Sequence, residues 1–265
     1  MSIFQSIILG VLQGIAEFLP ISSSGHLVIA QNFLGVNKAG IRLDVFLHFG
    51  TLLAIFAFYW KVILRLLGAI ILPKANKIER LAAWMYLAKI IISALPAIIV
   101  YFSFREQIED LFENSKMVGA LLMFTGAVVL GTRYLPRGTK DVSLLRALIM
   151  GAAQAVALLP GISRSGMTLA SARGGRVDGD KAAEFSFLMS APLIMGAAIL
   201  ELVKSLKNPI ADETSWPLVI FGSAISAVVG YYSLVILVKM LRGKNFWLFG
   251  IYCISVGLIT LVLSR

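Results

Sequence analysis

Charged residues and cysteine are scarce in this 265-residue chain. Only 14% of the residues are charged, 58% are hydrophobic, and the mean hydropathy is +0.88. This composition excludes an ordinary soluble domain of this length and is typical of an integral membrane protein. The single cysteine, Cys253, excludes an intrachain disulfide.

Acidic residues are the rarer charged class, with 14 Asp and Glu against 24 Lys and Arg and a formal net charge of +10. A basic chain raises the question of a nucleic-acid partner. Here, however, the basic residues lie in short links between apolar runs, which membrane topology explains better. We therefore expect membrane lipids as partners, and no nucleic acid.

One polar stretch, PGISRSGMT at 160–168, interrupts the apolar sequence. Its arginine can hold phosphate oxygens in a two-pronged way, its three hydroxyls can donate to them, and its two glycines allow backbone N–H groups to approach. The stretch is a candidate phosphate cradle. A polar turn between two helices is the alternative, and these residues alone leave both open.

A second copy of this stretch lies 141 positions earlier. Residues 8–25, ILGVLQGIAEFLPISSSG, match residues 149–166, IMGAAQAVALLPGISRSG, at eight of eighteen positions without a gap. Matched glutamine, serine and glycine residues are harder to obtain by chance than matched apolar ones. The pattern indicates a single membrane domain, 1–265, that contains an internal duplication, with repeat one at 1–141 and repeat two at 142–265.

The apolar runs predict an all-α polytopic membrane protein with six transmembrane helices plus two re-entrant helical hairpins. Each half begins with two short apolar pieces joined by a polar elbow, too short to cross a membrane and typical of a re-entrant hairpin. Three longer runs follow in each half, near 44–66, 82–104, 117–134, 182–203, 216–240 and 246–263. Because three crossings is an odd number, the halves form an inverted-topology repeat.

The charges of the links predict an orientation. Basic residues follow the first, third and fifth runs: Lys61, Arg65, Lys74, Lys77, Arg80, Arg133, Arg137, Lys140, Arg146, Lys239, Arg242 and Lys244. The other links hold an acidic group, Glu106, Glu109, Asp110 and Glu113, and a mixed set at 204–213. The positive-inside rule then places the basic links in the cytoplasm and both termini outside. The two elbows would meet near the middle of the membrane.

The two elbows would bring together Gln13, Glu17, Ser22, Ser23, Ser24, His26, Ser163, Arg164, Ser165 and Thr168. Glu17 and Arg164 each cost about 2.5 to 3.5 kcal/mol at the bilayer centre, so each needs a partner or a wet cavity. A purely structural salt bridge would also satisfy both. His26 follows the elbow glycine, where a helix N-terminus would disfavour the imidazolium and help hold a neutral base or nucleophile. A packed, satisfied histidine is the alternative. Asp44 and His48 form a further i, i+4 pair, for which an interfacial position is the simpler interpretation.

At this point the motifs can be compared with a known family. QGIAEFLPISSSGH at 13–26 resembles the (E/Q)-x-x-x-E segment and Ser/His elbow of the bacterial undecaprenyl pyrophosphate phosphatase family, also called the bacitracin-resistance protein family. PGISRSGMT is similar to the PGxSRSxxT signature of that family. FLHFGTLLAIF at 46–56 and EFSFLMSAPLIMGA at 184–197 also resemble it, so the resemblance covers nearly the whole chain.

The resemblance implies removal of the terminal phosphate of undecaprenyl pyrophosphate, a polyprenyl pyrophosphate lipid. The product would be the lipid carrier for peptidoglycan synthesis, and the activity would give bacitracin resistance. A divalent cation, Mg²⁺ or Ca²⁺, would assist, and the site would open to the periplasmic or outer face of the bacterial inner (plasma) membrane. The sequence leaves a homodimer open.

Carried over position by position, the resemblance implies a role for each polar residue of the elbows. The catalytic residues would be Glu17, Ser23, His26 and Arg164. The phosphate-binding residues would be Ser22, Ser24, Ser163, Arg164, Ser165 and Thr168. Glu17 and Gln13 would hold the metal, although Gln13 is the variant of the pattern that lacks a carboxylate.

Two questions about the chemistry stay open in the sequence. The nucleophile could be His26, Ser23 or a water activated by Glu17, and we favour His26. A transporter or flippase for a lipid phosphate or other anion is the rival function, since inverted repeats are common in transporters. A carrier needs affinity for an anion but no nucleophile, so a carboxylate and a histidine beside Arg164 favour the enzyme.

Overall fold

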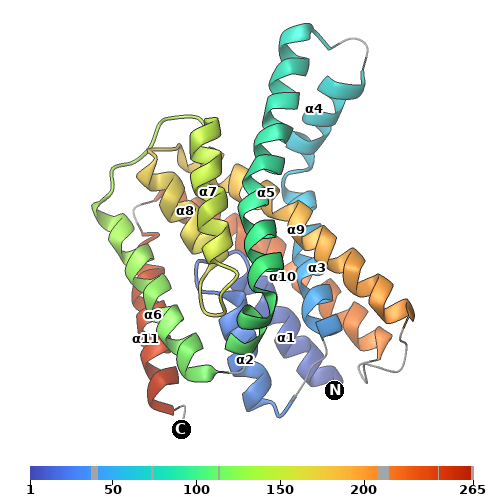
Figure 1. Cartoon of the computed structure of the whole chain (residues 1–265), viewed down its shortest axis with the longest axis vertical. Helices are drawn as coiled ribbons and strands as arrows, with labels where there is room; N and C mark the ends of the chain where they lie inside the picture. The colour runs from blue at the N-terminus through green and yellow to red at the C-terminus, as the bar shows by residue number, and fades with distance from the viewer. Residues whose placement is uncertain (37–40, 73–74, 113, 208–214, 244, 264–265) are drawn as a thin grey trace.

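The computed structural model describes residues 1–36, 41–72, 75–112, 114–207, 215–243 and 245–263 (Figure 1). Within these ranges every regular element is a helix, as the sequence predicts. Some of the charges used for the predicted orientation lie outside the described residues: Lys74, Glu113, Lys244, residues 208–213 and the side chains of Lys204 and Lys207.

Four of the described helices are long and apolar enough to cross a membrane. They are α5 (Lys77–Leu111), α6 (Ser115–Gly131) together with the 3-10 turn that continues it to Tyr134, α9 (Gly179–Lys207) and α10 (Trp216–Arg242). A fifth candidate is the pair α3 (Ile41–Phe58) and α4 (Trp60–Ile71), which is bent by 72°. α11 (Leu248–Leu263) is apolar but shorter, with 16 residues. A multi-pass membrane protein is therefore confirmed.

The predicted run at 44–66 differs from the structure, because the chain bends inside it. Tyr59 leaves the helical region, with φ −97° and ψ 18°, and divides α3 from α4. α3 packs against α9 and α10, whereas α4 packs mainly against α5 and buries none of its residues. The bend thus coincides with the point where the run loses its two packing partners.

Two helical hairpins enter the bundle from opposite ends (Figure 1). α1 (Ile3–Ala16) and α2 (Ser23–Phe33) form the hairpin at the end that holds both chain termini. α7 (Leu144–Val156) and α8 (Arg164–Gly174) form the other. The elbows of the two hairpins face each other inside the molecule.

Equivalent glycines fix the two hairpins on their neighbours. A Cβ atom on Gly10 of α1 would lie 2.6 Å from the carbonyl oxygen of Gly222 in α10. A Cβ atom on Gly151 of α7 would lie 2.3 Å from that of Ser93 in α5. Small residues let membrane helices approach this closely. The first helix of each hairpin is therefore held against a candidate span, and α6 packs along α11 beside them.

Candidate active site

A cavity of about 190 Å³ lies between the two elbows. Its polar lining comes from both halves of the chain: Glu17, Ser23, Ser24, His48, Gln154, Ser163, Arg164 and Ser190. The structure therefore brings together the two polar stretches that the sequence identified.

Glu17 is at the centre of the polar contacts. Its Oε1 accepts a hydrogen bond from Arg164 Nη2 at 2.5 Å, across 147 positions of sequence. Its Oε2 accepts from Ser23 Oγ at 2.8 Å and from Gln13 Nε2 at 3.1 Å. The Glu17 and Arg164 side chains are only 6% and 15% exposed, and pairing with further hydrogen bonds makes such burial tolerable. Because this ion pair borders a cavity, Arg164 has room to bind a second anion.

The two elbows share one capping hydrogen bond. Ser22 Oγ accepts a hydrogen bond from the Gly25 N–H at 3.3 Å, and Ser163 Oγ accepts from the Gly166 N–H at 3.1 Å. Each serine is thus the N-cap of the following helix, α2 or α8. The first helical residues are then Ser23 and Arg164, where backbone N–H groups lack intrahelical acceptors. Two helix N-termini border the cavity and favour an anion in it.

Arg164 is held in place from the α9 side. Its guanidinium lies 5.3 Å from the centroid of the Phe187 ring, and Nη1 donates to the Ser186 carbonyl oxygen at 3.5 Å. Thr168 donates to the Arg164 carbonyl oxygen at 2.8 Å, and its Oγ1 lies 2.6 Å from Ser186 Oγ. Thr168 therefore positions Arg164 and does not line the cavity.

The predicted phosphate ligands fall into two groups. Ser24, Ser163 and Arg164 line the cavity, whereas Ser22, Ser165 and Thr168 do not. The hydroxyls of the second group bond to the protein itself: Ser165 Oγ, for example, donates to the Leu19 carbonyl oxygen at 3.1 Å. These residues shape the elbows, and within this set only Ser24, Ser163 and Arg164 are placed to contact a ligand in the cavity.

His26 does not line the cavity. Its Nδ1 lies 2.9 Å from the Ser22 carbonyl oxygen, and its Nε2 lies 2.9 Å from the Tyr252 hydroxyl. A carbonyl oxygen only accepts, so Nδ1 carries the proton and Nε2 accepts from Tyr252. The Tyr252 ring is stacked on the imidazole, with centroids 5.6 Å apart. Both nitrogens are occupied, so this geometry does not favour His26 as the nucleophile.

Three polar residues of the cavity, His48, Gln154 and Ser190, were missed by the interpretation of the sequence. His48, expected at the interface, places Nε2 3.4 Å from Glu17 Oε2, while its Nδ1 donates to the Asp44 carbonyl oxygen at 2.7 Å. Gln154 is 3% exposed, and neither of its amide atoms has a hydrogen-bond partner in the described part of the chain. Its alignment with Gln13 was the signal that could have identified it.

The donor atoms give a limited fit to a divalent cation. Among the described residues, no group of three His, Cys, Asp or Glu side chains is placed to hold a metal. Glu17 is the one carboxylate that lines the cavity, and the nearby Gln13 Oε1 is buried without a hydrogen-bond partner in the described structure. A hard cation could bind these two oxygens if a bound phosphate supplied the remaining ligands.

Comparison with known proteins places the chain in a family. The family model described as "Bacitracin resistance protein BacA" matches residues 6–259. A protein of Halothermothrix orenii named undecaprenyl-diphosphatase is 38% identical, with 100% of this chain and 99% of the relative covered. Proteins of the same name from Methanosphaera stadtmanae (37% identical; 100% and 99% covered) and Desulforapulum autotrophicum (38%; 99% and 98%) are also similar. The family model and these relatives match nearly the whole chain, and the protein therefore belongs to the bacitracin resistance protein BacA family.

Proposed function

We propose that this protein is an undecaprenyl-diphosphatase. It hydrolyses undecaprenyl pyrophosphate to undecaprenyl phosphate and inorganic phosphate, which recycles the lipid carrier for peptidoglycan synthesis and gives bacitracin resistance. Relatives with that name match it along its whole length. The observation that carries the proposal is the position of Glu17, bonded both to the Ser23 hydroxyl and to Arg164 in one cavity.

In this proposal the pyrophosphate binds between the N-termini of α2 and α8. Arg164 supplies a planar fork of donors, and the backbone N–H groups at the two helix starts add partial positive charge. The unpartnered amide of Gln154 donates to a phosphate oxygen, which would satisfy a group that is costly to leave buried without a partner. Phosphoryl transfer depends mainly on such positioning and charge stabilisation.

We place Ser23 ahead of His26 as the nucleophile. The Ser23 hydroxyl lines the cavity and already donates to Glu17 Oε2 at 2.8 Å. Its Oγ attacks the terminal phosphorus, its proton passes to Glu17, and the bond to the bridging oxygen breaks to release undecaprenyl phosphate. Water then hydrolyses the phosphoserine and releases inorganic phosphate. Direct attack by water, with Glu17 as the base, is the competing route.

Substrate binding would also activate Glu17. In the free protein Arg164 holds Glu17 Oε1 at 2.5 Å, and a carboxylate paired in this way is a poor proton acceptor. An incoming phosphate that shares the same guanidinium weakens this pairing, which makes the carboxylate a better proton acceptor. His48 Nε2, 3.4 Å from Glu17 Oε2, lies close enough to share the proton that Glu17 takes.

We also propose that a divalent cation, Mg²⁺ or Ca²⁺, binds together with the substrate. Glu17 and Gln13 would hold it, and it would neutralise charge on the phosphate oxygens. With or without the ion, Glu17 bonds to Ser23 and Arg164, so the proposed roles of these two residues do not depend on the ion.

For the membrane we propose six transmembrane helices plus two re-entrant hairpins in an inverted-topology repeat. Support comes from the opposite entry of the α1–α2 and α7–α8 hairpins and from the position of both termini at one end (Figure 1). The cavity would open to the periplasmic or outer face of the bacterial inner membrane. The isoprenoid tail would lie in the lipid between spans.

Purified protein, a prenyl pyrophosphate and Mg²⁺ or Ca²⁺ test the function directly. We expect inorganic phosphate to be released in proportion to the prenyl monophosphate formed, and Ser23→Ala to abolish most of the release. If the protein binds the pyrophosphate but releases no phosphate with either cation, it would instead be a carrier or flippase.

A further inference from the structure

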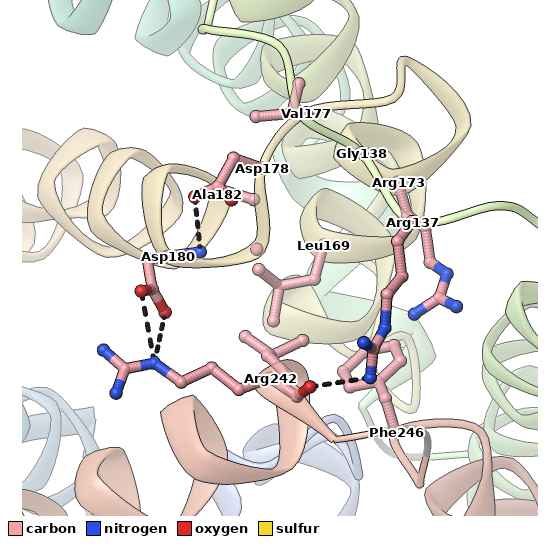
Figure 2. Close-up of a pocket in the computed structure, with 12 residues that line it drawn as sticks. Arg137, Gly138, Leu169, Arg173, Val177, Asp178, Asp180, Ala182, Arg242 and Phe246 are labelled. Atoms are coloured by element: carbon pink, nitrogen blue, oxygen red, sulfur yellow. Dashed lines mark hydrogen bonds and ion pairs between the residues drawn. The ribbon is translucent and has the colours of Figure 1, made fainter.

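A second cavity, of about 220 Å³ (Figure 2), lies at the end of the bundle opposite the termini (Figure 1). The connections α6–α7 and α8–α9 and the end of α10 border it. Three arginines line it, Arg137, Arg173 and Arg242, above a floor of apolar side chains. It is separate from the cavity around Glu17, because α8 begins in that cavity at Arg164 and ends in this one near Arg173.

Two of the three arginines lack a counter-charge among the residues that the structure describes. Arg137 Nη2 donates to the carbonyl oxygen of Arg242 at 2.8 Å, and Arg173 donates from Nε and Nη2 to that of Leu135 at 3.3 and 3.1 Å. Neither forms an ion pair with a carboxylate in the described ranges, whereas Arg242 Nε pairs with Asp180 Oδ1 at 2.8 Å. Figure 2 shows the Arg137 and Arg173 side chains side by side.

The juxtaposition of these two arginines has an electrostatic cost. Burial and then the nearby Arg137 charge lower the pKa of the Arg173 guanidinium, which lies outside the candidate spans. Asp178 also lines the cavity, but its Oδ1 accepts from the N–H groups of Asp180 and Lys181 at the start of α9. An anion between the two guanidinium groups would remove their repulsion.

Backbone contacts between the α6–α7 and α8–α9 connections hold the rim that carries these arginines. The N–H groups of Thr139 and Lys140 donate to the Arg176 carbonyl oxygen at 3.1 and 3.0 Å, and the Asp178 N–H donates to that of Lys140 at 2.9 Å. A Cβ atom on Gly138 would lie 2.0 Å from the Val177 carbonyl oxygen, so only glycine allows the two connections to touch. These contacts hold Arg137 and Arg173 at a fixed separation.

The surroundings match the headgroup level of a membrane. The floor includes Leu169 and Phe246, both only 2% exposed, and half-buried Leu241. Beside it, the Arg133 guanidinium lies 4.6 Å from the centroid of the Trp247 ring. Tryptophan and arginine are both common where lipid headgroups meet water. A phosphate group would meet the arginines, and an apolar tail attached to it would leave past half-buried Leu241.

We propose that this cavity binds the phosphate group of an anionic phospholipid. Arg137 and Arg173 hold the phosphate oxygens with their planar forks, and the acyl chains leave past Leu241 toward the bilayer. This site goes beyond the proposed phosphatase function and does not depend on it. A soluble phosphate shares the headgroup chemistry but would make no use of the apolar floor.

Lipid binding to the full-length protein can be measured without any assay of activity. Delipidated protein in a neutral detergent is titrated with phosphatidylglycerol, with phosphatidylcholine of the same acyl chains, or with inorganic phosphate, and bound ligand is counted by native mass spectrometry. We expect tight binding of phosphatidylglycerol only. Replacing both arginines, Arg137→Ala with Arg173→Ala, should weaken it by about 10- to 100-fold, as expected for lost charge-assisted hydrogen bonds.

Arg105→Ala is the matched control, because Arg105 lies at the end of α5 nearer the termini and is paired with Glu109. It should leave the affinity for phosphatidylglycerol unchanged. If the double variant fails to fold, Arg137→Gln alone, at an exposed position, should still weaken binding by about 10-fold. Equal affinity in the variants and the parent, or equal affinity for the two lipids, would overturn the proposal. Binding of inorganic phosphate as tight as that of the lipid would assign the cavity to a soluble anion instead.

Discussion

Arg164 is the residue on which phosphate binding depends most in this account. Arg164→Lys keeps the charge but loses the planar fork that can hold Glu17 and a phosphate oxygen together. We expect kcat/KM for a prenyl pyrophosphate to fall by about 10²-fold or more, with the protein still folded in the membrane. Thermal unfolding in detergent serves as the control for folding. Activity within a few-fold of the parent would show that Arg164 acts only as a structural counter-ion of Glu17.

Gln154 gives a sharper test of phosphate binding, because replacing it should weaken substrate binding without lowering the stability of the protein. The amide is buried without a partner in the described structure, so Gln154→Met, of similar volume, should leave Tm unchanged or raise it. The same change should raise KM by about 10-fold or more, since a hydrogen bond to a charged phosphate is lost. A lower Tm with an unchanged KM would identify Gln154 as a structural residue.

The sequence identified most of the cavity at the residue level, but not the direction of each side chain. Ser23, Ser24, Glu17, Ser163 and Arg164 were predicted together and do line one cavity. His48 lines the cavity and His26 does not, the reverse of the prediction. The rotation of each helix about its axis decides which of its side chains meet the cavity. α2 turns His26 toward Tyr252 of α11, whereas α3 turns His48 toward Glu17. The sequence does not predict either rotation, because an apolar helix without a polar face carries no pattern that shows which side faces a cavity.

At the level of helices, the contact between α7 and α5 should be sensitive to a single methyl group. In Gly151→Ala the new Cβ would lie 2.3 Å from the Ser93 carbonyl oxygen, so α7 must move away from α5. Such overpacking typically costs about 1 to 3 kcal/mol. We expect a lower Tm and reduced kcat, because α7 carries the elbow that places Arg164.

Gly196→Ala is the matched control, since nothing lies within 4 Å of a Cβ at that position in α9. It should leave Tm unchanged or raise it slightly, because alanine is the better helix former. If both variants behave alike, the close approach of α7 and α5 is not a determinant of stability.

The helices themselves were predictable where the sequence marks their ends. Ser22 and Ser163 are strong N-caps, and both elbows formed where the duplicated motif predicted them. The bend at Tyr59 was not predictable, because the run 44–66 contains no proline and no glycine near the break. Tertiary packing sets that bend, and the sequence does not show directly which helices will pack against each part of the run.

At the scale of the whole molecule, the proposed orientation places the end with both termini outside and the end with the α6–α7 connection in the cytoplasm. Cys253 is buried, so the parent chain should not react with an impermeant thiol reagent. With intact cells, Glu106→Cys near the end of α5 should react, whereas Thr139→Cys in the α6–α7 connection should react only after the membrane is opened. Both positions are exposed. Reversed labelling would contradict the proposed orientation, and equal labelling would contradict the separation of the two ends.

The most direct test of the central claim is to trap the phosphoryl group during a single turnover. A substrate labelled at the terminal phosphate is mixed with excess enzyme and quenched in acid or in alkali, and the labelled peptide is identified by mass spectrometry. Because a phosphoserine ester survives acid and a phosphohistidine does not, the account predicts acid-stable label on Ser23, absent from Ser23→Ala. Label on His26 that survives only in alkali, or turnover with no label at any time, would contradict it.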